Sequence, residues 1–238
     1  MRIGIVLVAL LLTSGAAAAG PLEPATVSPD GKTRFFWSNP SHSASIAADG
    51  LPLLAGADRR VLVSSMLPWP DFLSWCGDNL VVAAGGDRFT AHAKRLVVAA
   101  PPYRRTRPLS RDVRLSWVSP ACSPDGSFVV ASAGPNGTPR FGRERRSLWL
   151  LSLDGKRRMR LTRPPVGRSD EDACFSADSA TVYFVRSGPT TANATAKGRL
   201  YALRLSDRRL SALGRLGPVA NVFGHYAWPQ PATPRCGG

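Results

Sequence analysis

The residues that most often carry catalysis are few in this 238-residue sequence, and they are widely scattered. Its three histidines are His42, His92 and His225, and no two of them have the four-residue spacing by which a helix presents zinc ligands. The sequence also lacks the G-x-S-x-G turn that exposes the nucleophile of an α/β-hydrolase. We therefore predict no catalytic residue, no metal site and no cofactor.

Acidic residues recur at a regular interval, which points to a structural role. The motif Val27-Ser-Pro-Asp-Gly31 returns as Cys122-Ser-Pro-Asp-Gly126, and each copy precedes an apolar stretch. Proline fixes the backbone for a turn, aspartate accepts hydrogen bonds from nearby amides, and glycine adopts conformations that other residues resist. Weaker copies complete a series of turn aspartates: Asp30, Asp78, Asp125 and Asp178. A carboxylate repeated at the same turn is expected to shape hairpins, not to transfer protons.

The series defines a repeat of about 50 residues, since the four aspartates are 48, 47 and 53 positions apart. The third unit predicts strands at 127–133, 147–153 and 159–162, and the fourth predicts strands at 181–187, 199–205 and 210–213. With the strand expected before each turn, each unit offers about four short strands. A fifth, degenerate unit would begin at Tyr226-Ala-Trp-Pro229. The acidic group Asp170, Glu171 and Asp172 precedes the fourth motif and is expected in a solvated loop.

This pattern resembles the TolB-type, WD-like repeat of β-propellers. The best match runs from Leu148-Trp149-Leu150-Leu151-Ser152-Leu153-Asp154-Gly155 to Arg160-Leu161-Thr162, and the resemblance covers roughly residues 24–230. It implies an all-β fold of four-stranded antiparallel blades, with four clear repeats. TolB has six blades and a further α/β domain, and this sequence shows neither. Missed degenerate blades, closure by pairing near residues 223–228, and an open ring that needs a partner chain remain as alternatives.

The N-terminus has the order of features found in secretory signal peptides. Arg2 precedes an apolar run over residues 3–12, and small residues end in Ala17-Ala18-Ala19. We predict cleavage after Ala19, which divides the chain into a signal peptide (1–19) and a propeller domain (20–238). The expected location is extracytoplasmic, either secreted or periplasmic, with no transmembrane segment in the mature chain.

Four cysteines fit two disulfide bonds in an exported protein. When the repeats are aligned on the aspartate, Cys122 takes the place of Trp75 and Phe175, and Cys76 and Cys174 are one position to either side. Adjacent inner strands would bring such residues together. The preferred pairing is Cys76 with Cys122 and Cys174 with Cys236, while the other pairings and free buried thiols stay open.

A formal net charge of +15 is concentrated in three basic runs. They comprise Arg104, Arg105 and Arg107; Arg143, Arg145 and Arg146; and Lys156, Arg157, Arg158, Arg160 and Arg163. Such runs can lie in solvated turns without a binding role. They can also attract phosphate-rich polymers, anionic lipids or nucleic acid.

The sequence therefore predicts an exported, non-catalytic β-propeller that binds a protein or an envelope component. One alternative is a propeller enzyme of the lyase or hydrolase type, with His225 in its central channel beside Tyr226 and Trp228. The other is a polyanion-binding protein, which requires the arginine runs to meet on one face.

Overall fold

The computed structural model describes residues 26–32, 34–37, 54–56, 71–85, 93–103, 105–136, 145–188 and 198–215. Every helix or strand assigned in these ranges is a β-strand, and the strands form four antiparallel sheets, A to D in chain order. The predicted all-β class is confirmed. The predicted signal peptide, the ring-closing segment and His225 lie outside the described residues.

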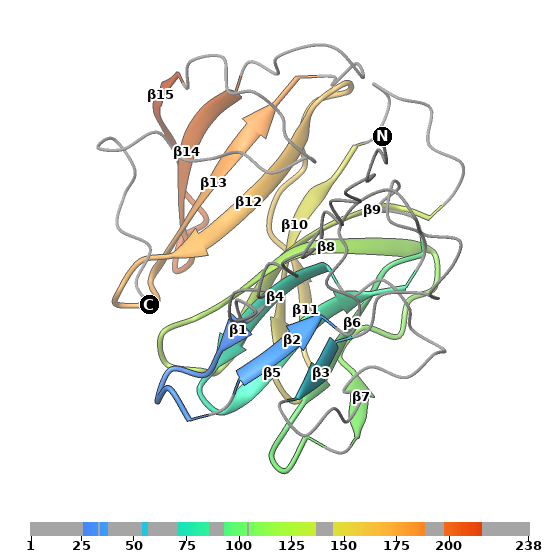
Figure 1. Ribbon diagram of the computed structural model, residues 1–238. Helices are drawn as coiled ribbons and strands as arrows, with labels where there is room; N and C mark the ends of the chain where they lie inside the picture. Colours follow the sequence, from blue (N-terminus) through green and yellow to red (C-terminus); the bar gives the residue numbers. More distant parts are fainter. Residues whose placement is uncertain are drawn as a thin grey trace, which may run out of the picture.

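In each sheet every strand pairs with the next strand of the chain, so each sheet is a simple meander (Figure 1). Sheet A contains β1 (Thr26–Val27), β2 (Arg34–Trp37) and β3 (Leu54–Gly56). Sheet B contains β4 (Asp71–Cys76), β5 (Asn79–Ala84), β6 (Arg95–Ala99) and β7 (Thr106–Pro108). Sheet C contains β8 (Leu115–Cys122), β9 (Phe128–Pro135), β10 (Ser147–Ser152) and β11 (Arg158–Arg160). Sheet D contains β12 (Ser169–Phe175), β13 (Thr181–Ser187), β14 (Gly198–Arg204) and β15 (Leu210–Arg215).

The strands predicted in the third and fourth units are confirmed to within about two residues at each end. Four strands per unit also hold for sheets B, C and D. The first unit differs, because the described residues of sheet A form three strands.

The middle strands are continuous apolar runs because both of their faces are buried. In β5, Val81 and Ala83 face one hydrophobic cluster, and the alternate residues Leu80 and Val82 face another. Successive side chains of a strand point to opposite faces, so an unbroken apolar run is what a sheet covered on both sides needs.

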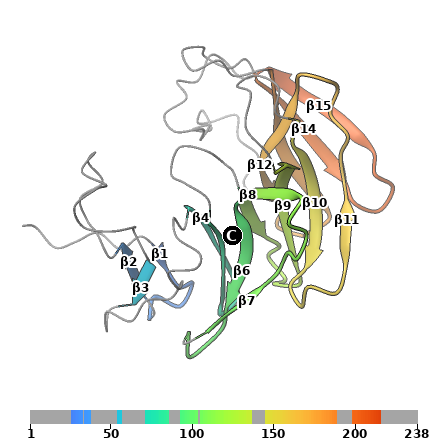
Figure 2. The ribbon, with the colours of Figure 1, turned by 90° about the vertical axis from the view of Figure 1, so that its right-hand side faces the viewer.

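These clusters place the sheets in a stack. Val81 and Val98 of sheet B share a cluster with Trp117, Val129 and Leu151 of sheet C. The opposite face of sheet C packs on sheet D through the cluster formed by Val130, Leu148, Phe175, Val182, Phe184 and Leu203. Figure 2 shows the resulting order, with sheet A on the side of sheet B that faces away from sheet C.

The first strands of sheets B, C and D, which are β4, β8 and β12, lie next to one another. The Cys122 amide donates to Ser74 Oγ over 3.1 Å, and Ser119 Oγ donates to an Asp172 carboxylate oxygen over 3.4 Å. Cys76 and Cys122 form a disulfide between β4 and β8, with their Cα atoms 5.2 Å apart. This bond is one of the two that the sequence predicted.

A repeated pair of hydrogen bonds, the inter-sheet clasp, joins sheet B to sheet C and sheet C to sheet D. The residue just before the third strand donates a hydrogen bond from its amide to a serine hydroxyl on the first strand of the next sheet. Its carbonyl accepts a hydrogen bond from the amide of the residue that follows this serine. Between sheets B and C the bonds are Lys94 N to Ser116 Oγ (3.1 Å) and Trp117 N to Lys94 O (3.0 Å). Between sheets C and D they are Arg146 N to Ser169 Oγ (3.2 Å) and Asp170 N to Arg146 O (3.1 Å).

Candidate binding surface

The short outer strand β11 presents two arginines on the side of sheet C that faces sheet B. Arg158 pairs with Leu151 and Arg160 pairs with Trp149 across the β10–β11 ladder. Alternation along the strand therefore sends both guanidinium groups to the same side. Their carbon atoms Cζ lie 5.2 Å and 5.9 Å from the centre of the Trp149 ring. Cation–π attraction holds two positive charges over one half-buried aromatic side chain.

Sheet B adds arginines to the same side. Arg107 on β7 donates from Nη2 to the Leu153 carbonyl over 2.6 Å, which links the outer strand of sheet B to the turn between β10 and β11. Asp112 accepts hydrogen bonds from Arg114 (3.1 Å) and from Arg158 (3.3 Å). One carboxylate thus ties Arg114, whose side chain is 85% exposed, to β11.

Three further contacts extend this surface beyond the end of β11. Arg160 donates from Nε to the Thr162 carbonyl over 3.0 Å and from Nη2 to Ser147 Oγ over 2.6 Å. Arg145 donates from Nε to the Pro164 carbonyl over 2.6 Å. Arg163, which is exposed, lies between those two anchoring residues in the chain. We call the whole group the arginine strip: Arg107, Arg114, Arg145, Arg158, Arg160 and Arg163.

The electrostatics of the strip are unbalanced. Hydrogen bonds from Arg114, aided by the positive charges of Arg114 and Arg158, lower the pKa of Asp112 to about 2. Asp112 is therefore fully ionised at neutral pH. At the other end, burial and then repulsion by Arg163 and Arg145 lower the pKa of Arg160. Burial and neighbouring positive charges both disfavour the charged form of an arginine, and here they act together.

The three basic runs of the sequence thus meet on one side of the molecule. Arg107 comes from the first run, Arg145 from the second, and Arg158, Arg160 and Arg163 from the third. The spacing in the sequence is a sign of this arrangement, because Arg107 and Arg158–Arg160 are about one repeat apart. Side chains one repeat apart take equivalent places on neighbouring sheets, in this case the outer strands β7 and β11.

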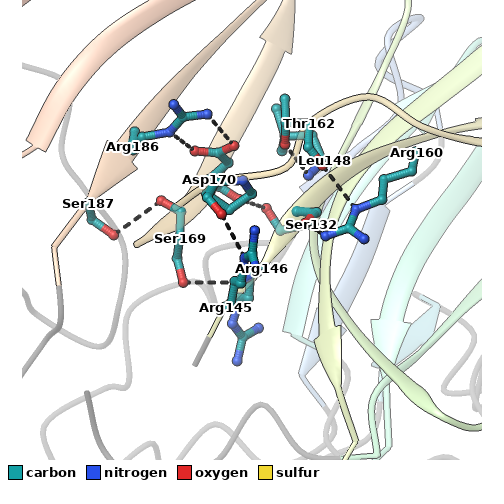
Figure 3. A network of polar contacts seen from close by, with 12 residues as sticks. Ser132, Arg145, Arg146, Leu148, Arg160, Thr162, Ser169, Asp170, Arg186 and Ser187 are labelled. Carbon is teal, nitrogen blue, oxygen red and sulfur yellow. Dashed lines mark hydrogen bonds and ion pairs between the residues drawn. The ribbon is translucent and has the colours of Figure 1, made fainter. Parts of the chain in front are cut away.

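A separate polar network lies between sheets C and D (Figure 3). Asp170 is fully buried and accepts two hydrogen bonds from Arg186, over 2.6 Å and 2.9 Å. The Arg186 guanidinium also lies 4.9 Å from the centre of the Tyr201 ring, and the Asp170 bonds raise its pKa. The Asp170 carbonyl accepts from Ser132 Oγ. This network corrects the prediction of a solvated acidic loop: Asp170 belongs to β12 and forms a buried ion pair, while Glu171 pairs with Arg146 over 3.4 Å.

The turn aspartates lie where hairpins need them. Asp125 accepts from Ser123 Oγ (2.5 Å) and from the Ser127 amide (3.1 Å), and Asp178 accepts from Ser176 Oγ and the Ala180 amide in the same way. Asp30 repeats this geometry, and so does Asp154. Asp78 differs, because it sits with Gly77 in a two-residue loop between Cys76 and Asn79.

The remaining sequence candidates are only partly described. Cys174 is disulfide-bonded, and Cys236, its predicted partner, lies outside the described residues, as does His225. In the described part of the chain, no three His, Cys, Asp or Glu side chains gather in a way that would hold a metal ion. Nor do those residues include a helix of the length and hydropathy required to cross a bilayer.

Comparisons with known proteins bear on the fold. No family model and no curated protein matches this sequence. Among solved structures, a putative TolB from Agrobacterium tumefaciens is 16% identical, with a TM-score of 0.55 over 80% of this chain and 64% of that one. An oligogalacturonate lyase in complex with manganese is 14% identical, with a TM-score of 0.53 over 82% and 53%. Dipeptidyl peptidase 4 from Porphyromonas gingivalis is 10% identical, with a TM-score of 0.53 over 79% and 31%.

This chain therefore spans less than two thirds of the length of each of these structures. At such identities the likeness concerns the fold alone, and that fold is β-propeller-like, as the TolB-type repeat implied. The three structures include both a TolB and enzymes, so the fold does not choose between binding and catalysis.

Proposed function

We propose that this β-propeller-like chain is an exported binding protein whose arginine strip attaches to an anionic component of the cell envelope. The observation that carries the proposal is the convergence of three separate basic runs on the outer strands of sheets B and C. Among the described residues, the Asp112 carboxylate bonds to two of these six guanidinium groups, those of Arg114 and Arg158. Like charges gathered on one surface raise the local positive potential, and an anionic ligand gains from that potential.

Binding is favoured over catalysis by the state of the buried polar groups. Asp170, Arg186 and Ser132 bond to one another or to backbone between sheets C and D, and Ser119 bonds to Asp172 between the inner strands. Groups fixed in this way stabilise the packing of the sheets. The arginine strip differs because exposed members such as Arg114 and Arg163 face solvent.

An extracytoplasmic location is part of the proposal. The predicted signal peptide supports it, and so does the disulfide between Cys76 and Cys122, because such bonds persist mainly in oxidising compartments. Mass spectrometry of the protein recovered from outside the cytoplasm tests this part. The expected mature chain begins at Gly20.

The binding proposal is tested with the full chain, expressed for export, and with polyanions purified from the envelope. A strip variant, Arg107→Gln/Arg114→Gln/Arg158→Gln, is compared with a control variant, Arg199→Gln/Arg204→Gln/Arg215→Gln, which removes the same charge from sheet D. The strip variant should bind roughly tenfold more weakly at low salt and show a shallower dependence of affinity on salt. The control should stay close to the parent protein.

Equal losses in the two variants would mean that net charge alone drives attachment, and the strip would lose its role. A protein retained from envelope extract at high salt by both variants would instead favour a protein-binding scaffold.

A further inference from the structure

Within the arginine strip, and resting on the function proposed above, we infer that Arg145, Arg160 and Arg163 form a recognition site for a phosphomonoester group of the ligand. We call these three residues the arginine triad. The argument uses the anchoring of the guanidinium groups, their charge, and the number of oxygens that a terminal phosphate presents.

The triad converges on one short segment of chain that follows β11. The carbonyl of Thr162 accepts from Arg160 Nε, and the carbonyl of Pro164 accepts from Arg145 Nε, over 3.0 Å and 2.6 Å. Arg163 lies between these two carbonyls in the sequence. The two bonds therefore anchor Arg160 and Arg145 at the residues that come directly before and after Arg163 in the chain.

The anchors themselves are held firmly. The Thr162 side chain is buried and accepts the Leu148 amide over 2.9 Å, while Ser147, which accepts from Arg160 Nη2, is 1% exposed. Figure 3 shows Arg160 beside Thr162 and Leu148. Because Arg145 and Arg160 are held by these bonds before binding, their guanidinium groups lose little conformational entropy when a ligand arrives, which favours directed hydrogen bonds over loose attraction.

The charge of the triad is not offset by a carboxylate among the described residues, where no ion pair involves any of its three members. The lowered pKa of Arg160 is consistent with this, since burial and, after it, the charges of Arg163 and Arg145 disfavour the charged form. An anion placed between the three groups would relieve that repulsion. The larger the anion's charge, the greater the relief.

A phosphomonoester meets these conditions best. It carries close to two negative charges at neutral pH and three terminal oxygens, so that each guanidinium can donate to one oxygen. A carboxylate or a phosphodiester has a single charge and two free oxygens, which satisfies fewer of the donors. The triad should therefore distinguish a terminal phosphate from the internal phosphates of a polymer.

Calorimetric titration of the full chain with phenyl phosphate, methyl phenyl phosphate and benzoate tests this discrimination, because the three probes share an aromatic ring and differ in the anion. Phenyl phosphate should bind roughly tenfold more tightly than the diester or the carboxylate. Its affinity should rise between pH 5 and pH 7.5, as the ester gains its second charge near pH 6, while the arginines stay charged throughout.

Arg163→Lys keeps the charge but removes the planar fork, and it should weaken phenyl phosphate binding several-fold. Because Arg163 is exposed, this variant should fold normally, and Arg199→Lys on sheet D serves as the matched control. Equal affinity for ester and diester, or an unchanged affinity in Arg163→Lys, would overturn the inference. Salt-sensitive binding of envelope polyanions would then still support the arginine strip, whereas loss of polymer binding as well would remove the proposed function itself.

Discussion

At the scale of single residues, the Ser-x-Asp turns show how closely local geometry follows side-chain chemistry. In three of them the residue after the aspartate is a glycine with positive φ: Gly31 (73°), Gly126 (70°) and Gly155 (77°). The fourth turn has Ser179 at this place, with φ at 59°. A side chain in this left-handed conformation brings its Cβ too close to the backbone.

Ser179→Gly should therefore stabilise the protein by about 1 kcal/mol, the usual cost of holding a non-glycine residue in the left-handed region. The bond from the residue 179 amide to the Ser176 carbonyl would be kept, because it involves backbone only. Urea unfolding followed by circular dichroism measures the change.

The control for this substitution is Ala177→Gly in the same turn. Ala177 is not among the residues with positive φ, so glycine there adds freedom to the unfolded chain without relieving strain. A stabilisation of similar size in both variants would show that strain at Ser179 is not the cause.

Acid should weaken the fold through carboxylates whose pKa is lowered in the native state. Arg114, by hydrogen bonding, holds the pKa of Asp112 at about 2, and serine hydroxyls lower the pKa of Asp125 and Asp178. Each lowered group stabilises the native state above its unfolded pKa near 4, and that contribution is lost as the pH falls toward the native value. Unfolding measured between pH 4 and pH 2 should thus show falling stability, and Asp112→Asn should make the fall less steep. A variant with the parent's slope would contradict this assignment.

Sequence reasoning worked well for turn residues and poorly for buried charge. Asp125 and Asp178 were predictable because each belongs to a four-residue motif, Ser-Pro-Asp-Gly or Ser-Ala-Asp-Ser, that forms one kind of local turn. Asp170 does not, because its role depends on Arg186, which reaches it from the neighbouring strand β13. From the sequence alone, a run of three acidic residues is expected in a solvated loop, because the arginine that pairs with one of them is not evident.

At the scale of elements, the first strands of sheets B, C and D share a feature that no turn motif marks. Each has a shift in strand pairing next to a residue with positive φ: Phe72 (43°), Ser119 (48°) and Asp172 (51°). These residues recur with the same spacing as the aspartates, so the irregularity belongs to the repeat. It was not predictable from composition, because bulges of this kind are usually sought at glycine.

The disulfide between β4 and β8 should contribute substantially to stability. It closes a segment with a sequence separation of 46, for which restriction of the unfolded chain gives about 4 kcal/mol. Cys76→Ala and Cys122→Ala should each lower the free energy of unfolding by most of that amount, as measured in urea without reductant.

The double variant Cys76→Ala/Cys122→Ala distinguishes the bond from the side chains. If the covalent link is responsible, the double variant should be no less stable than either single variant. Additive losses would show instead that each cysteine acts through its own packing.

At the scale of the whole molecule, protection from solvent varies steeply from the stacked middle strands to the last strand. Val81, Val98, Val129 and Val130 lie in middle strands and are at most 1% exposed, whereas all six residues of β15 are exposed. Local opening requires little free energy where few apolar contacts must break.

Amide hydrogen exchange should therefore be slowest in β5, β6 and β9 and fastest, among the strands of sheets B, C and D, in β15. Mass spectrometry of peptic fragments resolves these strands. Exchange in β15 as slow as in β9 would mean that another surface covers the last strand.

The sequence predicted the number and kind of strands in sheets C and D well, since the repeat provides the same signals twice. It did not predict that the basic runs meet. Arg107 and Arg145 are far apart along the chain, and only the stacking of one sheet on the next brings Arg107 of β7 to the turn between β10 and β11.

The inter-sheet clasp also has a direction, and this has a consequence for how such a chain can grow. Sheet C supplies one half of one junction from Arg146, the residue before its third strand, and one half of the other junction from Ser116 on its first strand. A duplicated segment of one repeat length, such as one running from Leu115 to the residue before Ser169, would carry both halves. A tandem copy of this segment should form a new junction with the same hydrogen bonds as the existing ones. Duplication of one repeat could therefore lengthen the array of sheets without any new type of contact.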